Sequence, residues 1–106
     1  MEIAFDTQRL RTLSENTAVA TRELGHSAAD GLRRRLADLR AAQSVCDLVA
    51  SPPTQLDDPL ELSIPIADGF HLVLRCNHLE APMLNTGSLD WSSVERVKIM
   101  GVERDG

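Results

Sequence analysis

The hydrophobic positions of this chain follow two periods, one of three to four residues in its N-terminal half and one of two residues in its C-terminal half. Apolar side chains recur at spacings of three and four in residues 7–24 and again in residues 28–46. Such spacing lines one side of a helix with apolar groups and leaves charged residues on the other side. The N-terminal half is therefore expected to form two amphipathic helices packed as an antiparallel hairpin.

Residues that commonly begin and end helices stand at the borders of both segments. Asp6 is placed to cap the first helix, whose spacing is compatible with an interruption near Asn16. Gly25 follows the last apolar position of this helix, and Ser27 is expected to cap the second one. A glycine after a helix readily takes the left-handed conformation that ends it. The two helices are therefore predicted to meet at a tight turn.

Alternation of apolar and polar positions predicts strands in four places, residues 3–5, 60–66, 70–76 and 94–102. Between the second and third of these strands, residues 67–69 have the sequence Ala-Asp-Gly. This sequence fits a three-residue hairpin loop with the glycine in the left-handed position. The C-terminal half is thus expected to contain a β-hairpin followed by a loop and a last strand.

The hairpin loop sets the register of its two strands. Counting outward from it places Glu61 opposite Arg75 and Pro65 opposite His71. The element order is then strand, helix, helix, strand, strand, strand. It predicts an α+β fold, in which an antiparallel sheet of about four strands carries the helical hairpin on one face. The length favours a single domain over residues 1–106.

Polar side chains gather on the sheet face that the helices would leave open. Strand parity is compatible with placing five residues there: Glu61, His71, Arg75, Arg96 and Lys98. Cleavage of RNA by a neighbouring 2′-hydroxyl needs a group to take its proton and cations to hold the charged phosphate. A histidine exchanges protons near neutral pH, an arginine grips a phosphate through two parallel bonds, and a lysine adds positive charge. His71, Arg75 and Lys98 are therefore candidate catalytic residues.

Each candidate also has a purely structural interpretation. Glu61 and Arg75 can form a cross-strand ion pair worth at most about 1 kcal/mol. The other three residues can be ordinary solvated side chains of exposed strands. Arg33 and Arg34 can likewise be part of the solvated face of a helix. The sequence leaves both interpretations open.

Charge is unevenly distributed along the chain. The net charge of −5 arises in residues 51–106, which hold four bases and nine acids, whereas residues 1–50 balance seven arginines against seven acids. An acidic protein repels RNA at long range, so a general nucleic-acid coat protein is unfavoured and only a local basic patch could meet RNA. No apolar run is long enough to span a membrane, and no signal peptide is evident.

The cysteines do not indicate a metal or redox site. Cys46 and Cys76 lack the paired spacing of zinc or disulfide motifs, and we expect both to be reduced and buried. His71 and His78 flank Cys76, but only Cys76 and His78 share strand parity, which gives two ligands where a structural zinc site needs four. No metal or other cofactor is predicted.

Several segments, taken in order, resemble a known family. They are GLRRRLADLRAAQS at residues 31–44, the hairpin of residues 61–74, NTGSLDWSSV at residues 85–94 and RVKIMGV at residues 96–102. Together they resemble the HigB-like branch of the RelE/ParE toxins, which are the toxin subunits of bacterial toxin–antitoxin modules. The resemblance extends over most of the chain and depends on the ordered set of segments rather than on one motif.

The resemblance implies a RelE/ParE-like fold and a cytoplasmic toxin without a membrane partner. Such a toxin binds a helix-turn-helix antitoxin, meets DNA only through it, and cleaves mRNA on the ribosome when released. His71 would then transfer the proton and Arg75 would clamp the phosphate, with Lys98 and Arg96 as supporting cations. No cofactor is implied.

The resemblance also implies surfaces that contact RNA or the antitoxin, for which the candidates are Arg33, Arg34, Arg96 and Glu61. An alternative stays open, because some positions depart from the family pattern. Residues 56–59 are Leu-Asp-Asp-Pro where such toxins usually carry Leu-Lys-Gly-Asp. The alternative is a catalytically degenerate toxin-fold protein that only binds an antitoxin.

Overall fold

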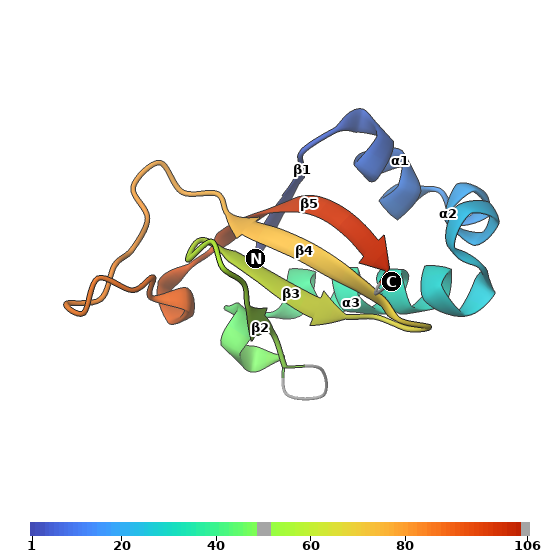
Figure 1. Ribbon diagram of the computed structural model, residues 1–106. Helices are drawn as coiled ribbons and strands as arrows, with labels where there is room; N and C mark the ends of the chain where they lie inside the picture. The colour runs from blue at the N-terminus through green and yellow to red at the C-terminus, as the bar shows by residue number, and fades with distance from the viewer. Residues whose placement is uncertain (49–51, 105–106) are drawn as a thin grey trace.

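The computed structural model describes residues 1–48 and 52–104, which form an α+β fold of helices on one face of a mixed sheet (Figure 1). This confirms the fold class predicted from the sequence. The described elements are β1 (Glu2–Phe5), α1 (Gln8–Glu15), α2 (Thr17–Leu24), α3 (His26–Ala41), the 3-10 turn η1 (Val45–Asp47), β2 (Thr54–Gln55), β3 (Glu61–Pro65), β4 (Phe70–Cys76), the 3-10 turn η2 (Trp91–Ser93) and β5 (Arg96–Arg104).

The sheet has five described strands in the order β1-β5-β4-β3-β2, and it is not purely antiparallel. The expectation of about four antiparallel strands is wrong in two respects. Residues 54–55, which lie outside the four predicted strands, pair with β3 as the short edge strand β2. β5 pairs antiparallel with β4 on one side. On its other side it pairs with β1, and these two strands run parallel.

The predicted helical hairpin is built from three helices rather than two. Asn16 ends α1, and its side chain accepts a hydrogen bond from the Val19 N–H at 3.1 Å, which starts α2. The N-cap of α1 is Thr7 rather than Asp6, since the Thr7 hydroxyl accepts the Leu10 N–H at 3.1 Å. The spacing thus correctly allowed a break near Asn16, but the capping residue was misplaced by one position.

Gly25 joins α2 to α3 and replaces the expected serine cap. Its φ of 86° ends α2, and α3 begins at the next residue, His26, without a side-chain cap. The expectation that Ser27 caps this helix is therefore wrong. The left-handed backbone of Gly25 makes the turn so tight that Ser27 already lies inside the helix.

The core lies between α3 and one face of the sheet. In Figure 1 the helix runs behind the sheet. Apolar residues of α3 and of β3, β4 and β5 belong to one buried cluster. The side chains that form the centre of this core are at most 4% exposed, and they are Leu32, Leu36, Leu39, Leu62, Ile64, Leu72, Leu74, Val97 and Ile99. The apolar residues that recur every three to four positions in α3 and every two positions in the strands are thus buried in the same layer.

Gly31 lets α3 approach the hairpin turn closely. A methyl group at this position would lie 3.1 Å from the Ile66 carbonyl oxygen and 3.3 Å from the Ala67 side chain. These distances are shorter than ordinary van der Waals contact. The absence of a side chain therefore sets how near the helix lies to the end of the sheet.

The hairpin register is confirmed. Glu61 pairs with Arg75 and Pro65 pairs with His71. The turn places Asp68 at φ 54° and Gly69 at φ 78°, two positive values that suit the Asp-Gly sequence. Pro65 has no N–H to donate, and β3 ends at this residue.

A β-bulge in β5 keeps the faces of the sheet in register. Val73 pairs with Gly101 while the next residue, Leu74, pairs with Ile99, so Met100 is an extra residue on β5. Without this extra residue, the side chains of residues 101–104 would point to the opposite face of the sheet from the one they now occupy. The strand itself begins at Arg96 rather than at residue 94.

Two further expectations concern single residues. Cys76 is buried as expected, but Cys46 is exposed in η1, so the expectation for Cys46 is wrong. The sequence Ser51-Pro52-Pro53 also predicts an end to the preceding helix, and Ser51 lies outside the described residues. None of the helices described is long and apolar enough to cross a membrane.

Candidate functional site

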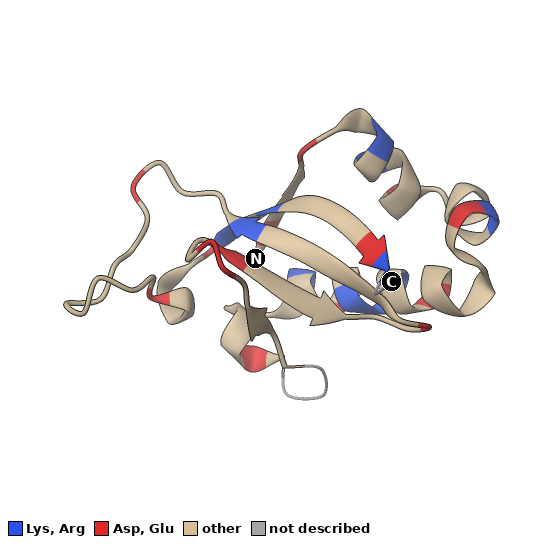
Figure 2. Ribbon diagram, viewed as in Figure 1, with Lys and Arg blue, Asp and Glu red and all other residues tan. Residues whose placement is uncertain are grey.

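The face of the sheet opposite α3 carries charged and polar side chains, and its cations gather at one end. Arg75 on β4 pairs in register with Lys98 on β5, and Glu61 on β3 pairs with Arg75. Figure 2 shows Lys and Arg on β4 and β5 side by side at this end, with acidic residues on β3 and the loop before it. We call the set Asp58, Glu61, Arg75 and Lys98 the charged cluster.

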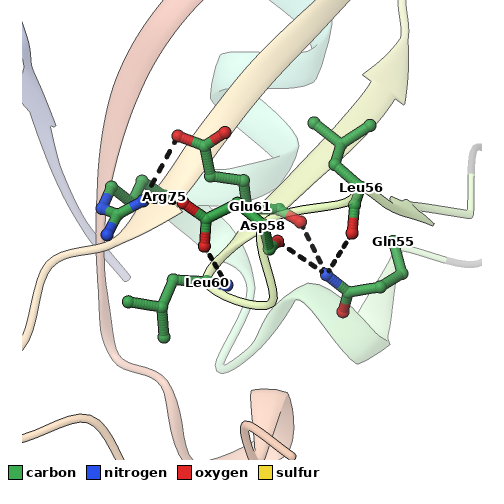
Figure 3. A network of polar contacts seen from close by, with 6 residues as sticks. All are labelled: Gln55, Leu56, Asp58, Leu60, Glu61 and Arg75. Carbon is green, nitrogen blue, oxygen red and sulfur yellow. Dashed lines mark hydrogen bonds and ion pairs between the residues drawn. The ribbon is translucent and has the colours of Figure 1, made fainter.

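Arg75 is held by two carboxylates (Figure 3). One of its terminal nitrogens, Nη1, lies 2.6 Å from Asp58 Oδ2 and 3.4 Å from Glu61 Oε2. The Arg75 side chain is 34% exposed, so water reaches the cluster. The cation expected to clamp a phosphate is therefore already bound to acidic side chains of the same chain.

Hydrogen bonds fix the charge state of this cluster. The Leu60 backbone N–H donates to Asp58, and together with Arg75 it lowers the pKa of the Asp58 carboxyl below its usual value. Asp58 and then Glu61 raise the pKa of Arg75. Both effects favour the ionised forms, so the ion pair persists over the neutral pH range.

Gln55 positions the loop that brings Asp58 to Arg75. Its Nε2 lies within hydrogen-bond distance of the backbone carbonyls of Leu56, Asp58 and Glu61, at 3.2, 3.2 and 2.9 Å. Its Oε1 accepts the indole N–H of Trp91 at 3.1 Å. The Gln55 side chain thereby holds three carbonyls of residues 56–61 together and links this loop to η2. Figure 3 shows the place of Gln55 in the network.

Lys98 and Arg96 lie on the neighbouring strand in different electrostatic settings. Arg96 pairs with Glu2 at 2.9 Å, an exposed contact made possible by the parallel pairing of β1 with β5. Among the residues that the structure describes, no carboxylate lies within ion-pair distance of Lys98. Lys98 is also the one lysine of the sequence. It is the cation of this face best able to meet an external anion.

His71 lies at the other end of the same face. Its Nε2 is 3.6 Å from Glu103 Oε2 on β5, and its side chain lines a hollow of about 450 Å³ beside the hairpin turn. Neither Arg75 nor Lys98 lines that hollow. His71 and Arg75 are four positions apart along β4, which corresponds to roughly 13 Å between their Cα atoms.

Arg33 and Arg34 are not part of this face. Both lie on α3, on the helical side of the sheet, and both pair with Asp30, Arg34 at 3.1 Å. Asp30 accordingly has a pKa lowered first by its hydrogen bond to Arg33. The seven site residues predicted from the sequence thus occupy three places. Glu61, Arg75, Arg96 and Lys98 lie together, His71 lies apart on the same face, and the two arginines of α3 lie elsewhere.

Sequence reasoning missed the acidic partners of these cations. In the sequence, Asp58 stands out only within the Leu-Asp-Asp-Pro segment of residues 56–59, and no pattern marks Glu2 or Glu103 as partners of these cations. The pairing of Glu103 with His71 follows from the hairpin-like register of β4 and β5 only once the bulge at Met100 is counted. No pattern in the sequence reveals the reach of Asp58, because it depends on the loop that Gln55 holds.

The described residues contain no group of three His, Cys, Asp or Glu side chains arranged to hold a metal ion. Comparison of the chain with protein-family models, with curated proteins and with solved structures gave no match. The open sheet face and the sequence resemblance are therefore the two features from which a function can be inferred.

Proposed function

We propose that this protein is the toxin-type subunit of a toxin–antitoxin pair and that its open sheet face and loops serve to bind a protein partner. The ordered resemblance to HigB-like toxins supports the pairing, and the α+β layering with one uncovered sheet face is compatible with it. The proposed partner is a helix-turn-helix antitoxin, and DNA would be contacted only through that partner.

One observation supports protein binding over RNA cleavage, namely that the candidate cations face acidic side chains. Arg75 contacts Asp58 and Glu61, Arg96 contacts Glu2, and His71 lies near Glu103. These carboxylates would repel an RNA phosphate, which would have to displace them to reach the cations. A protein surface can match alternating positive and negative groups without displacing either.

A second candidate function is ribosome-dependent cleavage of mRNA, and the position of Lys98 favours it. Lys98 pairs in register with Arg75 and is not neutralised by a described carboxylate. In this reaction the ribose 2′-oxygen would lose its proton to His71 and attack the phosphorus to form a 2′,3′-cyclic phosphate. The bond to the 5′-oxygen would break, and that oxygen would take up a proton from water. Arg75, Lys98 and Arg96 would stabilise the charge on the phosphate. The separation of His71 from Arg75 would have to close for both to serve one phosphate.

Inducible expression in a bacterial host tests both candidates in one experiment. The wild type is expressed alone and together with the protein encoded by the neighbouring reading frame, which the proposal expects to be a helix-turn-helix antitoxin, and growth and transcript ends are mapped. Protein binding predicts a stable complex that survives purification, with neither growth arrest nor new transcript ends when the wild type is expressed alone.

Two histidine variants separate chemistry from folding. His71→Ala removes the proposed proton-transfer group, and His26→Ala removes an exposed histidine at the start of α3 as the matched control. Transcript cleavage by the wild type and by His26→Ala, lost by about 100-fold in His71→Ala, would establish cleavage as the function. Failure of the wild type to form any complex with the neighbouring protein would overturn the binding function.

A further inference from the structure

The segment between β4 and η2, residues 77–90, forms an arm that projects beyond the end of the sheet (Figure 1). It folds back on itself through a bridge between Met83 and Leu89. Near its tip the Leu84 N–H donates to the Ser88 carbonyl at 2.7 Å, and Gly87, with φ 88°, donates to the Leu84 carbonyl at 3.0 Å. The arm is therefore a defined small hairpin rather than an open loop.

The base of the arm is anchored to the sheet on both sides. His78 Nε2 accepts the backbone N–H groups of Glu95 and Arg96 at 2.9 and 3.3 Å. On the returning side, Leu89 is buried at 5% exposure. Asp90 accepts hydrogen bonds from the hydroxyls of the two serines of η2, which lower its pKa. An anchored arm loses little conformational entropy when it binds a partner.

The arm concentrates exposed apolar surface. All of the large hydrophobic side chains classed as exposed in residues 1–48 and 52–104 lie on it: Leu79 at 105%, Met83 at 52% and Leu84 at 48% exposure. Apolar side chains gathered on one projecting element are typical of surfaces that bind another protein. The protein's own core cluster includes none of the three.

The charge of the arm selects the partner. Residues 77–90 contain no Lys or Arg, whereas Glu80 and Asp90 are acidic. Figure 2 shows the same, with acidic residues and no basic ones along the arm. A nucleic acid or an acidic peptide would be repelled, and a partner with apolar groups flanked by Lys or Arg would be complementary.

We propose that the arm is a docking element for a cationic amphipathic helix of the partner protein. Leu79, Met83 and Leu84 would contact the apolar stripe of that helix, and Glu80 would face its basic residues. This inference rests on the proposed binding function, and it adds where the partner binds and what chemistry its binding segment has.

A binding measurement with designed peptides tests the proposal directly. The probes are two fluorescent helical peptides of about 18 residues, long enough to form a helix, with the same leucine stripe and with either lysine or glutamate at all other positions. Fluorescence anisotropy measures their affinity for the full-length protein. We expect the lysine peptide to bind at least about tenfold more tightly than the glutamate peptide.

Two variants locate the binding on the arm. The triple variant Leu79→Ser, Met83→Ser and Leu84→Ser removes the apolar side chains without changing the charge, and these exposed residues can be replaced without loss of the core. The control variant Asn85→Ser and Thr86→Ser changes exposed polar residues of the same arm. We expect the triple variant to lose about tenfold or more in affinity for the lysine peptide and the control to match the wild type.

The outcomes separate the inference from the proposed function. Equal binding of the lysine peptide by the wild type and the triple variant, or no binding by either, would overturn the arm as a docking element. The same two proteins are then mixed with the protein encoded by the neighbouring reading frame. If the triple variant binds that protein as tightly as the wild type does, the arm is excluded while the binding function stands. If the wild type binds the lysine peptide through the arm but not that protein, the toxin–antitoxin pairing fails while the arm stands.

Discussion

The two faces of the same sheet differ in how much each depends on neighbouring elements. On the covered face, Leu72, Leu74 and Ile99 are fully buried beneath α3. On the open face, Arg75 meets water and two carboxylates, and Lys98 is partly exposed. Burial of apolar area stabilises the fold by about 25 cal/mol per Å², whereas exposed ion pairs contribute about 0–1 kcal/mol each. Stability is therefore expected to depend on the covered face, and the open face is available for function.

The largest expected effect comes from replacing one valine on each face with alanine. Val97 is 0% exposed and belongs to the core, whereas Val73 is 7% exposed on the open face and lies outside the core cluster. Val97→Ala should reduce the free energy of unfolding by about 2 kcal/mol, from lost transfer energy and the cavity left behind. Val73→Ala should reduce it by less than about 1 kcal/mol, because open-face neighbours can close over the gap.

Urea denaturation measures both variants, and the slope of the free energy against urea should not change. The same chemical group is removed from the same sheet in each case, so each variant is the control for the other. Equal losses would show that the open face is as tightly packed as the covered one.

A smaller effect is expected from Gln55→Ala. This change removes the bonds to the loop carbonyls and to Trp91 and should cost about 1 kcal/mol, since the group is solvent-accessible and water replaces part of the loss. Trp91 is the only tryptophan of the sequence, so its emission reports the change directly. Gln8→Ala, on the exposed face of α1, is the control. An unchanged Trp91 spectrum in Gln55→Ala would show that the loop is held by other contacts.

The smallest effect concerns acid. The pKa of Asp58 is lowered in the folded protein, first by the Leu60 N–H and then by Arg75. A carboxyl with a lowered pKa contributes stability that is present above its unfolded value, about 3.8 to 3.9, and is lost as the pH falls through its folded value. Asp58→Asn should therefore flatten the fall in thermal midpoint below about pH 4. Asp57→Asn, which removes the same charge from an exposed neighbour, should retain it. An identical acid profile in both variants would contradict the role of Asp58.

The elements that repeat a spacing were predictable from the sequence. The helical period identified Leu32, Leu36 and Leu39, and the Asp68-Gly69 turn set the register of β3 and β4. A local sequence pattern predicts an element correctly when the interactions that form the element lie within the same segment. Such patterns also placed Glu61 beside Arg75.

The parts that depend on distant segments were not predictable. The edge strand β2 exists only because residues 54–55 find β3, and the parallel direction of β1 depends on where β5 lies. The same holds for the site, because Glu2 reaches Arg96 through that long-range pairing, and Asp58 reaches Arg75 through a loop that Gln55 and Trp91 hold. Period and parity describe one segment at a time and cannot supply such contacts.

The parallel pairing of β1 with β5 also determines the order in which the molecule can fold. Among the strands that the structure describes, residues 2–5 pair only with residues 96–99. This pair therefore cannot form until nearly the whole chain has been synthesised. During synthesis the helices and the β3–β4 hairpin can form while the first strand still waits for the last. A chain interrupted before residue 96 would expose the edge of β4, and cellular proteases could remove it before it acted on anything.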